Sequence, residues 1–333
     1  MTDLAAGLAK KVLVTGSEGF IGSHLVEELV RDGQSVRAFV QYTSRNDWGW
    51  LDDLSADVMN NVEIVTGDIR DPFSVREAVK GCEQVFHLAA LIAIPYSYRA
   101  PLEYVQTNVV GTLNVVQAAR DLGISKVIHT STSEVYGSAL YVPIDEKHPL
   151  QGQSPYSASK IGADKIAESY FLSFGVPVVT IRPFNTFGPR QSARALIPTV
   201  ITQAFSREFI ELGSLDPIRD MNFVKDTVRG FVLAAKAANL DGEAINLCRG
   251  DGVSIGALVE MIQKIMGTEK EVRIAQSRLR PEKSEVVRLI GDNSRAKERL
   301  GWQPRTSLEL GLRQTVAWIQ KNQRYFKPNI YNQ

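Results

Sequence analysis

Short runs of β-branched residues alternate with helical patterns through the first half of the chain, and this alternation restricts the fold more than any other feature of the sequence. The predicted strands are 12–15, 35–40, 62–66, 84–87, 126–131 and 178–181. Between them, apolar residues recur with helical spacing over 21–32, 74–80, 102–122 and 156–174. Repeated strand–helix pairs predict βαβ units, and therefore an α/β fold with a doubly wound, Rossmann-like parallel sheet covered on both faces.

The second half of the chain is less regular, because several prolines interrupt it. Its helical patterns lie at 197–206, 226–238, 255–266 and 308–323. We therefore predict a dinucleotide-binding domain over residues 1–183, with its core at 10–183, and a smaller α+β lobe over 184–333 that mainly binds the substrate. Some segments of this second part are expected to return to the first domain. In the long loop after the second strand, we interpret Trp48 and Trp50 as core packing rather than as a lid.

The charge balance and the cysteines exclude several classes of function. Lys and Arg number 38 and Asp and Glu 37, which leaves a net charge of +1 and no arm or patch for nucleic acid or a charged membrane surface. No window reaches the roughly 18 uninterrupted apolar residues of a spanning helix. Met1–Lys10 lacks the features of a signal or transit peptide and is expected to be a short disordered lead-in. Cys82 and Cys248 show no metal-ligand spacing and are too few for a disulfide framework, which favours a reducing, cytoplasmic setting without a metal site.

Three glycines, Gly16, Gly19 and Gly22, stand where the first predicted strand gives way to a helix. Glycine at such positions lets the backbone turn sharply, approach a pyrophosphate without an intervening Cβ, and bring the helix close to the sheet. The positive end of the helix, at Phe20 and Ile21, then faces the phosphates. An ordinary tight turn is the alternative, but the place of this turn in the first βαβ unit favours NAD(P) binding.

The end of the second strand usually distinguishes NAD from NADP, because an acidic residue there binds the ribose 2′-hydroxyl. That acidic residue is missing here, and Ser44 with Arg45 is suited to a 2′-phosphate, which favours NADP. The alternative for Arg45 is a solvated loop residue. After the third strand, Asp68 and Ile69 follow where the adenine would lie, although Asp68 could equally be a helix N-cap before Pro72.

Tyr156 and Lys160 are four residues apart at the start of a predicted helix, so both project from one face. A free tyrosine has a pKa of about 10 and is a poor base at neutral pH. The Lys160 cation and the charge of the cofactor would favour its phenolate, which could then take a proton from a substrate hydroxyl.

The fifth predicted strand ends in hydroxyl groups and one carboxylate, from Ser131, Thr132, Ser133 and Glu134. The carboxyl edge of the sheet is where ligands bind in this architecture, although a Ser/Thr-rich turn would also explain the pattern. A simple alcohol dehydrogenase does not need the carboxylate. Abstraction of a carbon-bound proton beside a new ketone does require such a base.

With three further motifs, these residues resemble the NAD-dependent epimerase/dehydratase family of extended short-chain dehydrogenases/reductases over nearly the whole chain. The further motifs are the run from His87 to Ala90, Asn108 within 107–111, and 182–190. The segments 93–97 and 149–156 are most similar to the sugar-nucleotide 4,6-dehydratases of legionaminic acid biosynthesis. The resemblance implies a tightly bound NAD(P) that is regenerated in every turnover. The residues that it adds to the cofactor site are Leu88, Ala89, Ala90 and Asn108, beside the glycine turn, Tyr156 and Lys160.

The resemblance also implies a role for each catalytic candidate. Tyr156 would deprotonate the sugar 4-hydroxyl as hydride leaves C4, Lys160 would tune the phenol, and Thr132 would bind the 4-oxygen. Glu134 would then remove the C5 proton, and water would leave from C6. Many related dehydratases have an aspartic acid at the position of Ser133 that protonates the departing hydroxyl. GDP-mannose dehydratases resemble this chain in having serine, which implies that Glu134 serves as both base and acid.

Arginines of the second lobe are the natural clamps for a nucleoside diphosphate, because a guanidinium matches phosphate oxygens. By resemblance, Arg219 and Arg280 lie along the pyrophosphate and Asn185 reaches a phosphate or the sugar, with Arg190 as a further candidate. The alternative for each is a surface polar or ionic contact. Nothing in the sequence distinguishes a uridine from a guanosine substrate.

The leading interpretation is a 4,6-dehydratase that acts on a nucleotide-linked N-acetylglucosamine. A UDP-glucuronate decarboxylase shares the Ser-Thr-Ser-Glu string, and a sugar-nucleotide 4-epimerase usually lacks its glutamate. A non-catalytic dinucleotide sensor would have little reason to keep Thr132, Glu134, Tyr156 and Lys160 together. One scaffold carries many chemistries, so these alternatives stay open. The family resemblance and the apolar surface of helices 102–122 and 156–174 imply a homodimer.

Overall fold

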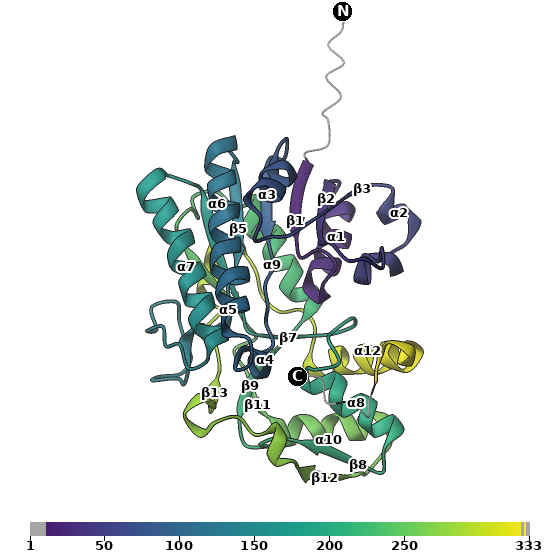
Figure 1. Ribbon diagram of the computed structural model, residues 1–333. Coiled ribbons are helices and arrows are strands. Elements are labelled where there is room, and N and C mark those ends of the chain that lie inside the picture. Colours follow the sequence, from purple (N-terminus) through teal and green to yellow (C-terminus); the bar gives the residue numbers. More distant parts are fainter. Residues whose placement is uncertain (1–10, 328–329, 331–333) are drawn as a thin grey trace, which may run out of the picture.

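The computed structural model describes residues 11–327 and residue 330, and the predicted lead-in Met1–Lys10 lies outside these residues. The described chain forms a larger lobe around a seven-stranded sheet and a smaller lobe that holds a four-stranded and a two-stranded sheet (Figure 1). The predicted α/β class with a doubly wound parallel sheet is confirmed. Among the helices of the described residues, none is both long and apolar enough to cross a membrane.

All neighbouring strands of the seven-stranded sheet are parallel, in the order β10-β6-β5-β4-β1-β2-β3. The strands are β1 (Lys11–Thr15), β2 (Ser35–Gln41), β3 (Val62–Gly67), β4 (Gln84–His87), β5 (Lys126–Thr130), β6 (Val178–Pro183) and β10 (Ala244–Leu247). Each strand predicted in the first half is present, with ends that shift by at most two residues. The strand β10 was not predicted, because its apolar run is short and lies in the irregular second half.

Helices cover both faces of this sheet (Figure 1). One face carries α3 (Pro72–Val79), α6 (Gly111–Leu122) and α7 (Pro155–Phe174), and the other α1 (Phe20–Arg31), α9 (Val224–Lys236) and α11 (Ser294–Leu300). The helix α9 comes after residue 183 in the sequence but packs on the larger lobe, where its buried face contacts α1, β5 and β6. The helix predicted over 102–122 consists of α5 (Pro101–Tyr104), a π-helical segment (Val105–Val110) and α6.

The smaller lobe is built from short elements. Its four-stranded sheet comprises β7 (Asn185–Phe187), β9 (Ile218–Phe223), β11 (Gly252–Ser254) and β13 (Arg288–Leu289), and its two-stranded sheet β8 (Phe209–Leu212) and β12 (Glu271–Ile274). Its helices are α8 (Leu196–Ser206), α10 (Ile255–Met266) and α12 (Leu308–Lys321). The short helices α2 (Ala56–Met59) and α4 (Ile94–Ser97) lie in connections of the larger lobe.

The loop that follows β2 is held by aromatic contacts to the end of the chain. The Trp50 ring meets the rings of Trp318 and Tyr325 edge-on, at centroid distances of 5.4 and 5.0 Å. Trp48 packs against the main hydrophobic core. Both tryptophans therefore serve packing, as interpreted from the sequence, and the loop is braced by α12 and the turn after it.

Candidate active site

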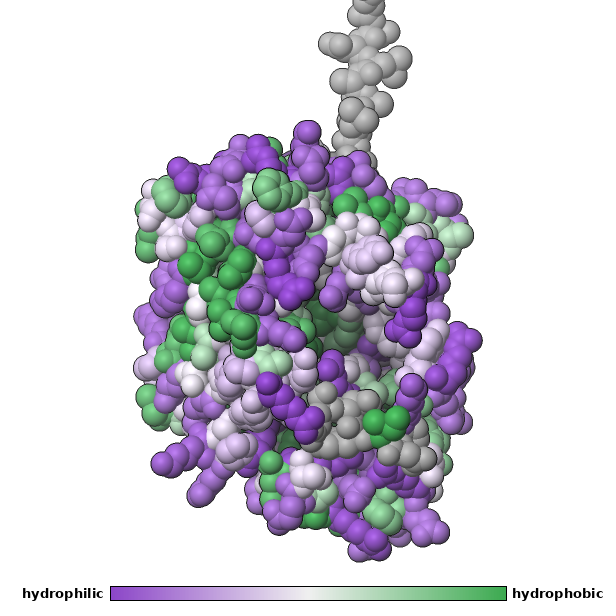
Figure 2. All heavy atoms as spheres, in the orientation of Figure 1, coloured by the Kyte–Doolittle hydropathy of each residue, from purple (hydrophilic) through white to green (hydrophobic). Residues whose placement is uncertain are grey.

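A cavity of about 910 Å³ opens between the two lobes, and its walls include the carboxyl ends of β2, β3, β5 and β6. Figure 2 shows the surface hollowed at this place. The carboxyl ends of parallel strands meet at one edge, which is where ligands bind in doubly wound folds. The predicted site residues that line the cavity are Gly16, Gly19, Phe20, Ile21, Gly22, Asp68, Ile69, Leu88, Ala89, Ala90, Thr132, Ser133, Glu134, Tyr156, Lys160, Asn185, Arg219 and Arg280.

The glycine turn has the close packing that a dinucleotide requires. Gly16 has a left-handed φ of +67°, and a Cβ on Gly22 would lie 2.1 Å from the Gly16 carbonyl oxygen. The Gly19 N–H donates to that same oxygen over 3.2 Å, and α1 begins at the next residue. The positions of Gly16 and Gly22 therefore require glycine, and the N-terminus of α1 lies on the cavity wall. The residues therefore fit a bound pyrophosphate.

Tyr156 and Lys160 lie in the first two turns of α7, where Ser154 caps the helix by accepting a hydrogen bond from the Ser157 N–H over 3.1 Å. Both side chains are buried. Burial raises the pKa of Tyr156, and the negative charge of Glu134 adds to this effect while the Thr132 hydroxyl opposes it. Burial lowers the pKa of Lys160 to about 8. Lys160 Nζ donates to the Thr130 carbonyl oxygen over 2.6 Å, which fixes the amine beneath the carboxyl end of β5.

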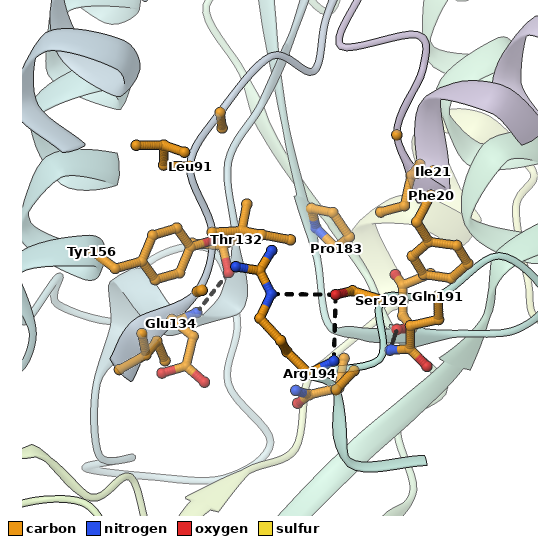
Figure 3. A pocket seen from close by; sticks show the side chains of 18 of the residues that line it. Phe20, Ile21, Leu91, Thr132, Glu134, Tyr156, Pro183, Gln191, Ser192 and Arg194 are labelled. Atoms are coloured by element: carbon orange, nitrogen blue, oxygen red, sulfur yellow. Dashed lines mark hydrogen bonds between the residues drawn. The ribbon is translucent and has the colours of Figure 1, made fainter. Parts of the chain in front are cut away.

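Thr132 and Glu134 face the cavity from the 3₁₀ turn Ser133–Tyr136 that follows β5 (Figure 3). Thr132 is the N-cap of this turn, and its hydroxyl accepts a hydrogen bond from the Glu134 N–H over 3.2 Å. This bond fixes both residues beside Tyr156. The arrangement places a phenol, a hydroxyl and a carboxylate on one wall, which can move protons at neighbouring atoms of one ligand.

A buried polar network beneath this wall was missed by the sequence analysis. Asp164 accepts hydrogen bonds from His129 Nε2 at 3.0 Å, Ser131 Oγ at 2.8 Å and the Arg182 guanidinium at 3.2 Å. Burial raises the pKa of Asp164, but the hydrogen bond from His129 and the nearby cations outweigh it, so that the pKa lies below its ordinary value. Asp164 follows Lys160 by one helical turn, and this spacing was the signal that could have identified it.

Polar groups of the smaller lobe reach the cavity from the other side. Arg219 is buried and lies 3.2 Å from Glu285 Oε1, whereas the Arg280 guanidinium is 3.8 Å from the same oxygen, too far for a hydrogen bond. One buried guanidinium nitrogen of Arg280 and the Asn185 Oδ1 have no hydrogen-bond partner within the described residues. Buried polar atoms without partners are rare, which marks these two as sites for a ligand atom.

Three predicted site residues do not line the cavity. The Arg45 side chain is 87% exposed and lies 3.6 Å from Asp47. Arg190 turns toward α1, where it pairs with Glu27 at 2.8 Å. Asn108 lies in the π-helical segment and binds the Leu91 backbone through both amide atoms, at 2.9 and 3.0 Å, so it shapes the cavity wall from behind.

Asp68 does not cap the helix α3. The N-cap of α3 is Asp71, whose carboxylate accepts hydrogen bonds from the Phe73 and Ser74 N–H groups. Asp68 instead pairs with Arg70 at 2.6 Å. The N-cap alternative for Asp68 is therefore wrong, and its carboxylate remains on the cavity wall.

The chain matches the model of one protein family, and the relatives that it resembles have several different activities. The family model described as GDP-mannose 4,6 dehydratase matches residues 13–315. A dTDP-glucose 4,6-dehydratase of Actinoplanes sp. is 33% identical, over 95% of this chain and 99% of the relative. A UDP-glucose 4-epimerase of Mycolicibacterium smegmatis is 34% identical, over 93% and 98%. UDP-glucuronic acid decarboxylase 1 of Xenopus tropicalis is 30% identical, over 97% of this chain and 75% of the relative.

Solved structures extend this likeness to the whole fold. A dTDP-glucose 4,6-dehydratase of Streptomyces venezuelae, solved with NAD bound, superposes with a TM-score of 0.88 at 30% identity and covers 95% of this chain and 99% of its own. A UDP-glucose 4-epimerase of Thermotoga maritima, solved with UDP-glucose, superposes with a TM-score of 0.85 at 30% identity, over 94% and 99%. Dehydratases and epimerases of sugar nucleotides thus share this fold.

Proposed function

Because the chain belongs to the GDP-mannose 4,6-dehydratase family of extended short-chain dehydrogenases/reductases, we propose that it is a sugar-nucleotide 4,6-dehydratase acting on a nucleotide-linked N-acetylglucosamine. The observation that carries this proposal is the presence of Glu134 beside Tyr156 and Thr132 on one cavity wall. A 4-epimerase needs only the phenol for its proton transfers, whereas elimination needs a second group that can take a proton from carbon.

The proposed reaction assigns a proton transfer to each side chain. Tyr156 takes the proton of the sugar 4-hydroxyl, while the Thr132 hydroxyl binds the same oxygen and Lys160 supplies positive charge behind it. When bound, the nicotinamide supplies hydride chemistry and is restored at the end of the turnover. Glu134 takes the C5 proton, which the adjacent ketone makes acidic, and returns a proton to the C6 hydroxyl so that it departs as water. As hydride returns to C6, Tyr156 gives its proton to C5, which completes the product and restores the phenolate. Ser133 carries no acid, so Glu134 performs both transfers.

The substrate diphosphate is proposed to lie against the smaller lobe. One guanidinium nitrogen of Arg280 is without a hydrogen-bond partner in the described residues, which supports this assignment, and Arg219 is a second buried cation in the same cavity wall. Asn185 Oδ1 also lacks a partner in the described part of the chain, and it could accept a hydrogen bond from a sugar hydroxyl. Arg190 has no part in this proposal, because it is paired with Glu27 away from the cavity.

A UDP-glucuronate decarboxylase is the second candidate, and one side chain favours it. Figure 3 shows Arg194 extending into the cavity toward the wall that holds Thr132 and Tyr156, with its Nε bonded to Ser192 over 3.3 Å. A decarboxylase requires a cation for the C6 carboxylate of its substrate, and Arg194 could supply it.

Mass spectrometry in deuterated water tests both candidates. We would incubate the purified protein, without added cofactor, with UDP- and GDP-linked N-acetylglucosamine and with UDP-glucuronate. Loss of water with uptake of one solvent deuterium is the expected result for one of the first two substrates. Glu134→Gln should abolish this loss, whereas Glu168→Gln, on the exposed side of α7, should not. Loss of carbon dioxide from UDP-glucuronate would establish the decarboxylase instead, and an unchanged mass with altered stereochemistry would establish an epimerase.

We also propose a homodimer formed through α5, the π-helical segment, α6 and α7. Large apolar side chains are exposed along this face, among them Leu102 at 66%, Val105 at 47% and Leu172 at 72%. Figure 2 shows apolar residues gathered over α5 and α6. Contiguous apolar patches of this kind mark protein interfaces.

A further inference from the structure

A carboxylate of the glycine turn occupies the strand end at which the sequence lacks an acidic residue. Glu18 lies between Gly16 and Gly19, and its Oε1 accepts a hydrogen bond from the Gln41 N–H over 3.0 Å. Gln41 is the last residue of β2. The side chain is thus anchored where doubly wound dehydrogenases place the carboxylate that reads the adenosine ribose, although it comes from a different element.

The second oxygen of this carboxylate faces no hydrogen-bond donor among the residues that the structure describes. Glu18 Oε2 is buried and has no hydrogen-bond partner within the described residues, and both Glu18 and Gln41 line the cavity. Burial raises the pKa of Glu18, while the Gln41 N–H acts in the opposite direction and favours the charged form. A buried oxygen without a donor is costly, so the site is complete only when a ligand brings a hydroxyl to it.

The backbone of Glu18 is held by the loop that follows β2. The Trp50 N–H donates to the Glu18 carbonyl oxygen over 3.1 Å, and Trp50 is itself clamped by Trp318 and Tyr325. Gly49 packs so closely that a Cβ there would lie 2.8 Å from the same carbonyl oxygen. The glycine turn therefore cannot easily swing the carboxylate away from β2.

The nearby cations do not compensate this negative charge. Arg45 is solvent-exposed and does not line the cavity. Arg70 does line it, but its guanidinium is bound to Asp68 at 2.6 and 3.0 Å. A phosphate placed beside Glu18 would therefore meet an anion without a matching cation.

We propose that Glu18 is the residue that selects NAD over NADP: its carboxylate accepts hydrogen bonds from the adenosine ribose hydroxyls and repels a 2′-phosphate. This inference rests on the proposed function, because it assumes that the cavity binds a dinucleotide. This proposal replaces the prediction of NADP, which was based on Ser44 and Arg45, because Arg45 lies outside the cavity.

Competition between the two nucleotides tests the proposal directly. The purified protein is equilibrated with equimolar NAD and NADP, unbound nucleotide is removed, and the bound nucleotides are released and quantified by chromatography. The ratio of bound NAD to bound NADP should be about ten or more for the wild type. Two negative charges that face each other repel, and this repulsion weakens the binding of NADP several-fold to many-fold. Glu18→Gln keeps an acceptor for the Gln41 N–H but loses the charge, and should reduce this ratio at least about tenfold.

Three further variants serve as controls for this competition experiment. Glu103→Gln removes another carboxylate from the same cavity and should leave the ratio unchanged, as should Arg45→Ala. Glu18→Ala also removes the charge but introduces no side-chain amide. It should lower the ratio as Glu18→Gln does, so that a folding defect in one of the two variants could not explain the result. A wild type that binds NADP as well as NAD, or an Arg45→Ala variant that alone loses NADP, overturns the role of Glu18. If wild type binds neither nucleotide, the proposed function fails together with this inference.

Discussion

Burial acts on both residues at the centre of the proposed reaction, and it disfavours the charged form of each. It raises the pKa of Tyr156 and lowers the pKa of Lys160 to about 8. At neutral pH, Lys160 is therefore mostly protonated and Tyr156 keeps its phenolic proton in the protein alone. In the proposed reaction, the Lys160 cation and the positive charge of a bound oxidised nicotinamide together favour the phenolate, so the base becomes competent when the cofactor is in place.

Replacing the phenol should separate catalysis from binding. We expect Tyr156→Phe to lower kcat by about 10²- to 10⁴-fold, the usual contribution of a positioned acid–base group, while nucleotide binding changes little. Steady-state rates and nucleotide binding measured on the same preparation test this. Tyr170→Phe is the control, because Tyr170 lies on the same helix but donates to Gln117, away from the cavity. Equal rates for Tyr156→Phe and wild type would remove the phenol from the mechanism.

The lowered pKa of Lys160 should appear as a pH dependence of stability. An unfolded lysine has a pKa of about 10.4, so between about pH 8 and pH 10 the unfolded chain keeps a proton that the folded protein has lost. Stability therefore rises with pH in this window, by up to about 3 kcal/mol from this residue alone. In urea unfolding of the nucleotide-free protein, Lys160→Met should lack this rise, and Lys165→Met, whose amine is exposed and paired with Glu168, should keep it. Parallel curves for Lys160→Met and wild type would show an ordinary lysine pKa.

At the scale of the element, the start of α7 is what positions the phenol. Ser154→Ala removes the N-cap one residue before Pro155 and two before Tyr156, and should cost about 1 kcal/mol of stability. Because the first turn loosens, kcat should also fall about 10- to 100-fold. Ser307→Ala removes the cap of α12, which carries no predicted catalytic residue, and should lower stability without changing kcat. The prediction fails if the two variants have the same kcat.

The elements of the larger lobe were predictable because their signals are local. Strands such as β1 and helices such as α7 follow from apolar runs and helical spacing within a few residues. The glycine turn and the Tyr156–Lys160 pair follow in the same way. The contacts of Glu18 with Gln41 and of Asp164 with His129 join residues far apart in the chain, so no local pattern predicts these partners, although the spacing from Lys160 places Asp164 on the same helix face.

At the scale of the whole molecule, the exposed apolar face predicts a second copy of the chain. Leu102→Glu combined with Leu172→Glu places charges on the face formed by α5 and α7, and should convert a dimer into a monomer. Light scattering after gel filtration measures the mass. Leu310→Glu is the control, because Leu310 is also an exposed leucine of a helix but lies on α12. A monomeric wild type would contradict the proposed assembly.

The strand β10 has a consequence for how the protein is made. It pairs with β6 at the edge of the seven-stranded sheet, yet its residues Ala244–Leu247 follow much of the smaller lobe in the sequence. A ribosome therefore delivers β6 well before its outer neighbour, and until then the nascent sheet ends in an open row of backbone N–H and C=O groups. A chain arrested before residue 244 would keep β6 as its edge strand, and that edge could pair with another chain and start aggregation.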